Sequence, residues 1–171
     1  KWVEQAWPAE AWGDRWGMLH GQQAGQCGVA WAARSRMAST GRAERGGRGI
    51  YRLRGSVPPP QAALRVAWLE LAPSVPVWDR VGDQGVVSHR SAATLFSLGN
   101  LPAEVHEFTL PVRRQTRRAD GRLYRGDVTA GLVIRAGLLL TPPAGTVLAL
   151  PTPRPDRAAV PSLPGAPRPG R

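Results

Sequence analysis

The chain of 171 residues is long enough for one medium domain or two small ones, and its 17 prolines and 20 glycines indicate much loop. Its 23 basic residues against 12 acidic residues give a formal net charge of +11, which favours a polyanionic partner such as nucleic acid. The lone Cys27 excludes a secreted disulfide scaffold, and no apolar run reaches the roughly 18 residues of a membrane span, so we expect a cytoplasmic protein without membrane contact.

Residues 1–17 predict a poorly structured leader, because the spacing of Trp2, Trp7, Trp12 and Trp16 follows no helical stripe. Met18 is either the natural start of the protein or an internal residue of a longer one. The predicted folded part therefore begins at residue 18.

Residues 18–56 predict a winged helix-turn-helix, a DNA-binding unit of two helices followed by a basic β-hairpin. We expect a first helix over residues 19–27 and a sharp turn at Gly28. A second helix is expected over residues 29–40, ended by Gly41 as the residue after its C-cap.

The predicted hairpin has its turn at Gly46-Gly47, and period-2 alternation puts Tyr51 and Leu53 on one face. In such a unit the second helix enters the major groove and the hairpin contacts neighbouring phosphates. The predicted DNA-binding residues are Arg34, Arg36, Arg42, Arg45, Arg48, Arg52 and Arg54. Alternatively, these arginines only solvate a small domain, since every basic residue except Lys1 is arginine and a GC-rich coding bias raises their number.

Two residues count against the helix-turn-helix. Arg34 stands where the second helix usually buries an apolar side chain, and Ala30 is a weaker N-cap than serine or threonine. Repacking of Trp31 or Met37 is the expected compensation.

Residues 57–150 predict a small α+β domain, which follows a polyproline-like hinge over residues 56–60. Its first element is a helix over residues 61–71. The expected core stripe of this helix is Leu64, Trp68 and Leu71.

Residues 86–98 predict a short apolar strand that leads directly into a capped helix. Ser88 is the expected N-cap, with its hydroxyl accepting from the backbone N–H of Ser91 or a neighbour. The buried face of this helix is expected to contain Ala92, Leu95 and Phe96.

A half-buried strand is predicted over residues 105–112, with Phe108, Leu110 and Val112 on one face, and a further strand begins at Leu123. Another buried strand is predicted over residues 132–140. From Pro142 onward proline density favours neither helix nor strand, and residues 151–171 predict a disordered tail rich in proline and arginine.

A basic turn separates two of these strands, and another arginine follows the predicted N-cap. We expect these side chains to contact phosphate or an acidic protein surface: Arg90, Arg113, Arg114, Arg117 and Arg118. The alternative is an ordinary solvated loop.

The residues give little sign of an active site. His20, His89 and His106 have no ligand partners at metal-binding spacing, and Ser88-His89 lacks a third group to orient the histidine. We therefore expect no enzyme, no catalytic residue, no cofactor, no metal and no small-molecule substrate.

Three segments resemble the AbiEi family of antitoxins from type IV toxin–antitoxin systems of abortive infection. Residues 41–53 are similar to that family's wing, residues 87–98 to the SHRSAA helix of its second domain, and residues 137–150 to its TTPARTLLDL stretch. Gly145 and Ala149 depart from the family's Arg and Asp, which indicates a truncated or degenerate member.

The resemblance implies a DNA-binding antitoxin and transcriptional autorepressor, which binds an inverted repeat in its own promoter and antagonises a nucleotidyltransferase-like toxin. Two alternatives stay open. One is a generic basic protein that binds RNA or DNA without antitoxin activity. The other is a restriction-like nuclease, which needs clustered carboxylates for its metal.

Overall fold

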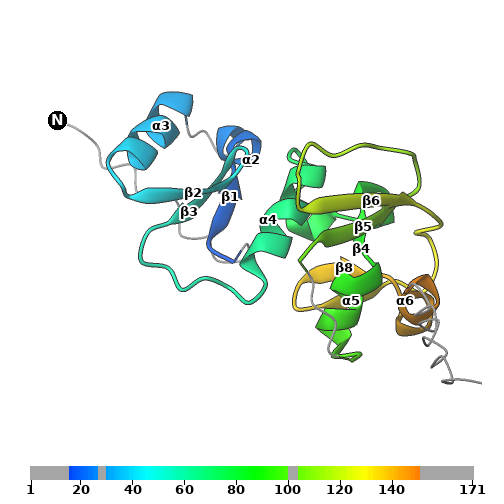
Figure 1. Ribbon diagram of the computed structural model, residues 1–171. Helices are drawn as coiled ribbons and strands as arrows, with labels where there is room; N and C mark the ends of the chain where they lie inside the picture. Colours follow the sequence, from blue (N-terminus) through cyan, green and yellow to red (C-terminus); the bar gives the residue numbers. More distant parts are fainter. Residues whose placement is uncertain (1–15, 27–29, 100–103, 151–171) are drawn as a thin grey trace, which may run out of the picture.

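The computed structural model describes residues 16–26, 30–99 and 104–150 (Figure 1). The N-terminal elements are β1 Met18–His20, α2 Gly21–Gln26, α3 Trp31–Ser39, β2 Ala43–Gly47 and β3 Ile50–Leu53. They are followed by α4 Ala62–Leu71 and the short 3-10 turns η1 Val77–Asp79 and η2 Gly82–Gln84. The C-terminal elements are β4 Val86–Val87, α5 His89–Phe96, β5 His106–Leu110, β6 Gly121–Arg125, β7 Val133–Arg135, β8 Leu138–Leu140 and α6 Pro143–Ala149. This mixture of helices and two sheets confirms the predicted α+β class, whereas the predicted tail and most of the predicted leader lie outside the described residues.

The N-terminal sheet has the order β1-β3-β2, and both of its pairings are antiparallel. The prediction of a helix over residues 19–27 is wrong at its start, because Met18–His20 pairs with β3 and α2 begins only at Gly21. The predicted hairpin turn is displaced as well. β2 continues through Gly47, and the chain reverses at Arg48 and Gly49, where Gly49 has the left-handed φ of 73° that glycine adopts without strain.

α3 is shorter than the helix predicted over residues 29–40, since its N-cap is Ala30 and its C-cap is Thr40. The backbone N–H of Thr40 donates to the carbonyl of Arg36 at 2.8 Å, which closes the last turn. Gly41 follows with a φ of 70°, so its predicted role after the C-cap is confirmed.

The C-terminal sheet has the order β6-β5-β4-β8-β7, with β5 parallel to β6 and antiparallel to β4. Phe108 and Leu110 of β5 are buried, as predicted. Val112 lies beyond the end of β5 and is 62% exposed, so its predicted burial is wrong. Because β5 and β6 are parallel, the basic segment between them is a crossover along the sheet and not the tip of a hairpin.

Two expectations for residues after 131 are wrong. The apolar run over 132–140 is split by a turn at Ala136 and Gly137 into the antiparallel pair β7–β8, and only β8 is largely buried. α6 forms at Pro143–Ala149 in spite of its prolines. Pro142 is its N-cap and Pro143 its first residue, positions where the helix needs no backbone N–H.

α5 forms as predicted, with Ala92 buried and both Leu95 and Phe96 packed against the core. Ser88 occupies the N-cap position, but its hydroxyl makes no hydrogen bond to the helix backbone. It accepts instead from the Thr109 hydroxyl of β5 at 2.8 Å. The predicted capping contact of Ser88 is therefore wrong.

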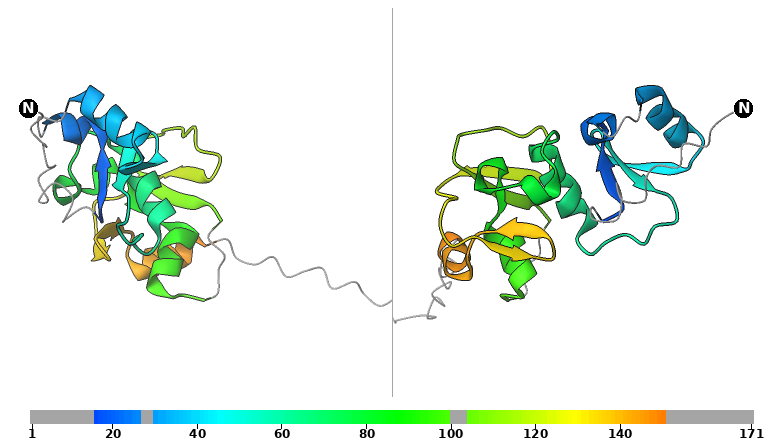
Figure 2. Two further views of the ribbon diagram at one scale, coloured as in Figure 1. Left: turned by 90° about the vertical axis from the view of Figure 1, so that its left-hand side faces the viewer. Right: turned by 180° about the vertical axis from the view of Figure 1, so that it is seen from behind.

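α4 lies between the two sheets and packs against both (Figures 1 and 2). The predicted stripe is confirmed: its three residues belong to the core of the C-terminal sheet, with Leu64 3%, Trp68 1% and Leu71 7% exposed. Val66 and Leu69, on another side of the same helix, pack with Met18 and Ile50 of the N-terminal sheet. The residues over 56–60 are thus followed by a shared helix that joins the two modules.

Trp16 extends this shared core from the end of the predicted leader. The centroid of its ring lies 6.3 Å from that of Trp68. The Arg65 guanidinium lies over the Trp16 ring, 4.0 Å from the ring centroid. Arg65 itself is buried and donates to the carbonyls of Pro60 and Ala136, each at 2.8 Å. Trp16, which belongs to the predicted leader, is therefore part of the packed structure.

Candidate nucleic-acid interface

Most of the arginines predicted to bind DNA are exposed on α3 and the β2–β3 hairpin. Arg34 lies on α3, but its side chain falls outside the described part of the structure. The exposed members are Arg36, Arg42, Arg45, Arg48 and Arg54. A polyanion can therefore approach each of these five side chains from solvent.

Arg52 differs from the others because its guanidinium is already occupied. The strand register places it opposite Glu44, and the two side chains form an ion pair. Its Nη1 also donates to the Ser56 carbonyl at 2.8 Å, and the side chain is only 19% exposed. Arg52 therefore fastens the hairpin to the linker and is not a free cation for DNA.

The crossover between β5 and β6 carries the second predicted group of arginines. Arg113 and Arg117 are exposed, whereas Arg114 donates to the Leu71 carbonyl at the end of α4 at 2.6 Å. Arg118 forms ion pairs with Asp120 at 2.7 Å and with Glu70 at 3.1 Å. Its hydrogen bonds to Asp120 raise the pKa of Arg118 and lower the pKa of the Asp120 carboxyl. Among the described residues, Arg113 and Arg117 thus have no partner, whereas Arg114 and Arg118 are held by hydrogen bonds or ion pairs.

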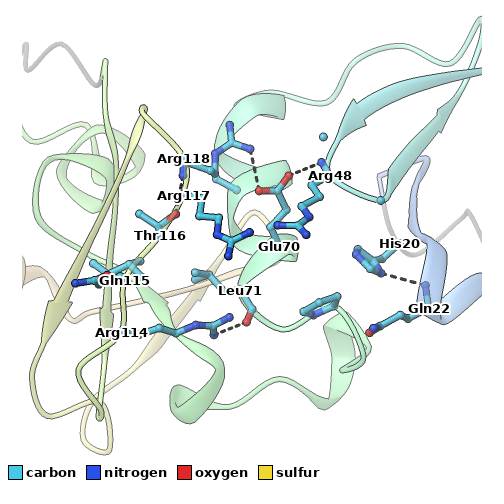
Figure 3. A pocket seen from close by; sticks show the side chains of 15 residues that line it. His20, Gln22, Arg48, Glu70, Leu71, Arg114, Gln115, Thr116, Arg117 and Arg118 are labelled. Atoms are coloured by element: carbon cyan, nitrogen blue, oxygen red, sulfur yellow. Dashed lines mark hydrogen bonds and ion pairs between the residues drawn. The ribbon is translucent and has the colours of Figure 1, made fainter.

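A cleft of about 730 Å³ separates the hairpin turn from this crossover (Figure 3). It brings Arg48 together with Arg114, Arg117 and Arg118, which the sequence assigns to different modules. Polar side chains share the rest of its wall with apolar ones and with the Glu70 carboxylate: His20, Gln22, Gln115 and Thr116 are polar, and Ala67, Leu71, Pro73 and Leu123 are apolar. The arrangement can hold an anion but contains no nucleophile paired with a base.

Glu70 of α4 organises this cleft and was not among the predicted site residues. Its Oε1 accepts from the backbone N–H of Arg48 at 2.7 Å, and its Oε2 accepts from Arg118. The carboxylate thus contacts both modules from the helix between them. In the sequence, Glu70 is distinguished only by its position off the core stripe of this helix. An ordinary solvent-exposed glutamate has the same position, so the sequence does not identify Glu70 as a site residue.

A second polar cluster lies where β4 enters α5, around a hollow of about 530 Å³. His89 stacks on Tyr124 with ring centroids 3.8 Å apart, and its Nδ1 lies 2.9 Å from the Ser88 hydroxyl. Glu107 accepts from the Tyr124 hydroxyl and from the backbone N–H of Arg90, each at 2.8 Å. Since the carboxylate is committed to these donors, it does not orient His89 as the third member of a nucleophilic triad.

Burial governs the titration of this cluster. It lowers the pKa of His89, although the charge of Glu107 opposes the shift, and it raises the pKa of Tyr124. The Arg90 side chain is exposed at the rim of the same hollow. Both shifts favour neutral side chains, as in a packed structural network.

Within the described residues, no group of three or more His, Cys, Asp or Glu side chains is placed to hold a metal ion. No helix of the described ranges is long and apolar enough to cross a membrane. Comparison with protein-family models and with curated proteins finds no match to this chain.

Proposed function

We propose that this chain binds double-stranded DNA through a winged helix-turn-helix formed by β1, α2, α3, β2 and β3. The observation that carries the proposal is the pairing of β1 with β3, the second strand of the hairpin, which thereby becomes the central strand of the sheet. Along the chain, α2 and α3 lie between β1 and the hairpin. The pairing therefore joins the strand before the two helices to the hairpin after them in one sheet. A two-helix unit fixed to a basic hairpin is the arrangement that helix-turn-helix proteins use on duplex DNA.

The exposed arginines support the same proposal. Arg36 lies in the last turn of α3, the helix that would enter the major groove, where base edges differ between base pairs. Arg45 and Arg48 lie on the hairpin, where they would contact phosphates and set the position of the helix. Such contacts release counterions, so binding is expected to weaken steeply with salt.

We further propose that the chain is an AbiEi-type antitoxin that represses its own operon. The support is the resemblance, together with one packing relationship. Residues 87–98 and 137–150, two of the three similar segments, include α5 and α6, and these helices pack against each other. We assign the antitoxin role to the surface that these two helices share.

The test of DNA binding is fluorescence anisotropy with labelled duplexes of about 30 base pairs that tile the DNA upstream of the gene. We expect one duplex with an inverted repeat to bind more tightly than a scrambled duplex. R36A and R45A should weaken binding, each reducing the salt slope by about 1, whereas R125A, an exposed arginine of β6, should have little effect.

Equal affinity for the inverted repeat, scrambled DNA and random RNA would instead favour a generic basic protein. The antitoxin role is tested separately, by co-expressing the chain with a nucleotidyltransferase-like protein encoded beside it. Restored growth supports that role, and unchanged toxicity at confirmed expression argues against it. The DNA-binding proposal does not depend on this second outcome.

A further inference from the structure

Two free guanidinium groups face the cleft between the modules. Arg48 comes from the β2–β3 turn and Arg117 from the β5–β6 crossover, and Figure 3 shows both side chains pointing into the space between them. Both residues are exposed, and within the described residues no contact occupies either guanidinium. The two modules thus each present an uncommitted cation to one cleft.

The remaining charges of the cleft do not cancel these two. Among the described residues that line it, Glu70 is the only carboxylate, and it already accepts from Arg118 and from the backbone N–H of Arg48. Arg114 is held by the neutral Leu71 carbonyl and therefore keeps its full positive charge. The cleft has a positive excess that a bound anion would neutralise.

The site is held in shape before any ligand arrives. Gly47 lies so close to α4 that a Cβ atom there would collide with Val66 and with the Glu70 carboxylate. The hydrogen bond from the Arg48 N–H to Glu70 then fixes the turn at its tip. The backbone that carries Arg48 is therefore fixed before an anion binds, which leaves only the side chains to be ordered.

We propose that this cleft binds a backbone phosphate of the DNA duplex, so that the C-terminal module extends the contact made by α3 and the hairpin. The inference rests on the proposed DNA binding. Figure 1 shows the β5–β6 crossover on the same upper side of the molecule as α2 and α3, so a duplex that lies along this side would approach both modules.

A backbone phosphate suits the cleft better than a nucleotide. Among the described residues, no tryptophan, tyrosine or phenylalanine lines it, so it lacks the large aromatic side chains on which bases commonly stack. Arginine pairs well with phosphate oxygens, because its planar group presents several N–H donors in a fixed geometry. Contact with phosphate contributes affinity without reading sequence.

The test compares R117A with R113A in the full chain. Arg113 lies on the same crossover and is exposed, but it does not line the cleft. We expect R117A to weaken binding of the inverted-repeat duplex and of scrambled DNA alike, by about fivefold, and to reduce the salt slope by about 1. R113A should bind as the wild type does, and R117K should recover most of the loss.

Folding of each variant is checked by far-ultraviolet circular dichroism. R48A should also lose affinity for the duplex, and the double variant R48A/R117A should lose less than the sum of the two single losses in binding free energy. Equal losses in R117A and R113A would overturn the site, because they would indicate a diffuse field. Unchanged binding by R117A would overturn it while the proposed DNA binding stands, and a wild type that binds no duplex would overturn both. If inorganic phosphate or ATP raises the melting temperature of the wild type but not of R117A, while DNA affinity is equal in the two proteins, the ligand is a free phosphate compound and not DNA.

Discussion

The Glu107 carboxylate of β5 accepts a hydrogen bond from the backbone N–H of Arg90 at 2.8 Å and so caps α5 from the neighbouring strand. The other carboxylate oxygen accepts from the Tyr124 hydroxyl of β6, also at 2.8 Å. Glu107 is 5% exposed, and both bonds lie at a partly buried site beside the hollow. One buried side chain therefore joins the start of α5 to two strands of the sheet, near the positive end of the helix dipole.

Removal of this cap should be costly. We expect Glu107→Ala to lower the free energy of unfolding by about 2–3 kcal/mol, because it leaves two donors without a partner. Tyr124→Phe removes only one of the two bonds and should cost about 1 kcal/mol. Urea denaturation measures both, with Glu104→Ala, an exposed residue at the rim of the same hollow, as the control. Similar stabilities of the Glu104 and Glu107 variants would contradict this role.

Much of the fold was predictable where the signal is local. The stripe of Leu64 and Trp68, the position of Gly41 after α3 and the helix after Ser88 each depend on a few neighbouring residues. β1 was not predictable, because three residues carry no alternation and become a strand only by pairing with β3. The division of the 132–140 run into β7 and β8 likewise depends on strand pairing, since the two halves pair with each other and β8 also pairs with β4.

The candidate site was less predictable than the fold, because its contacts join residues far apart in the chain. Glu70 contacts residues 22 positions before it and 48 positions after it, and Glu107 caps a helix that begins before it in sequence. An arginine count cannot separate Arg117, which is free, from Arg118, which is paired. Composition predicted the charge of this surface, and tertiary structure decides which cations remain available.

Arg80 stabilises the end of α4 in a way that its sequence position does not indicate. Its buried guanidinium donates to the carbonyls of Trp68 at 2.5 Å, Leu69 at 2.9 Å and Ala72 at 2.6 Å. Burial lowers the pKa of Arg80 to about 10, so the group remains charged at neutral pH. It thereby supplies donors to carbonyls that the helix itself leaves without partners.

We expect Arg80→Met to lower the free energy of unfolding by about 3 kcal/mol, because it leaves these carbonyls buried without donors. Arg80→Lys keeps the charge but reaches fewer carbonyls, and it should cost about half as much. Chemical denaturation with Arg125→Met as the exposed control, expected within about 0.5 kcal/mol of the wild type, checks both. If Arg80→Met were as stable as its control, the interaction would contribute little.

The hairpin packs closely against α4 because position 47, a glycine, carries no Cβ atom. Gly47→Ala should lower the free energy of unfolding by about 1–3 kcal/mol, since its Cβ would overlap Val66 and Glu70. Gly46→Ala is the matched control, because a Cβ there meets Val66 at an ordinary 3.5 Å. Thermal unfolding of the two variants distinguishes them. A Gly46 variant that is less stable than the Gly47 variant would show that the hairpin is not closely packed against α4.

Two histidines predict how stability depends on pH. Burial lowers the pKa of His89 and of His106 below the ordinary value, so each is preferentially neutral in the folded chain. Between the lowered folded pKa and the unfolded value of about 6.5, the unfolded state binds more protons, and stability therefore rises with pH. The contribution is fully present above about pH 6.5 and declines as the pH falls below it.

The melting temperature should accordingly fall from about pH 7.5 to about pH 5.5. Asparagine cannot titrate, and it tolerates the left-handed backbone that His89 adopts at a φ of 50°. The double variant His89→Asn and His106→Asn should therefore show a smaller fall over this interval, and each single variant an intermediate one. A wild type that becomes more stable on acidification would mean that the neighbouring carboxylates, Glu107 and Asp120, outweigh burial at these two sites.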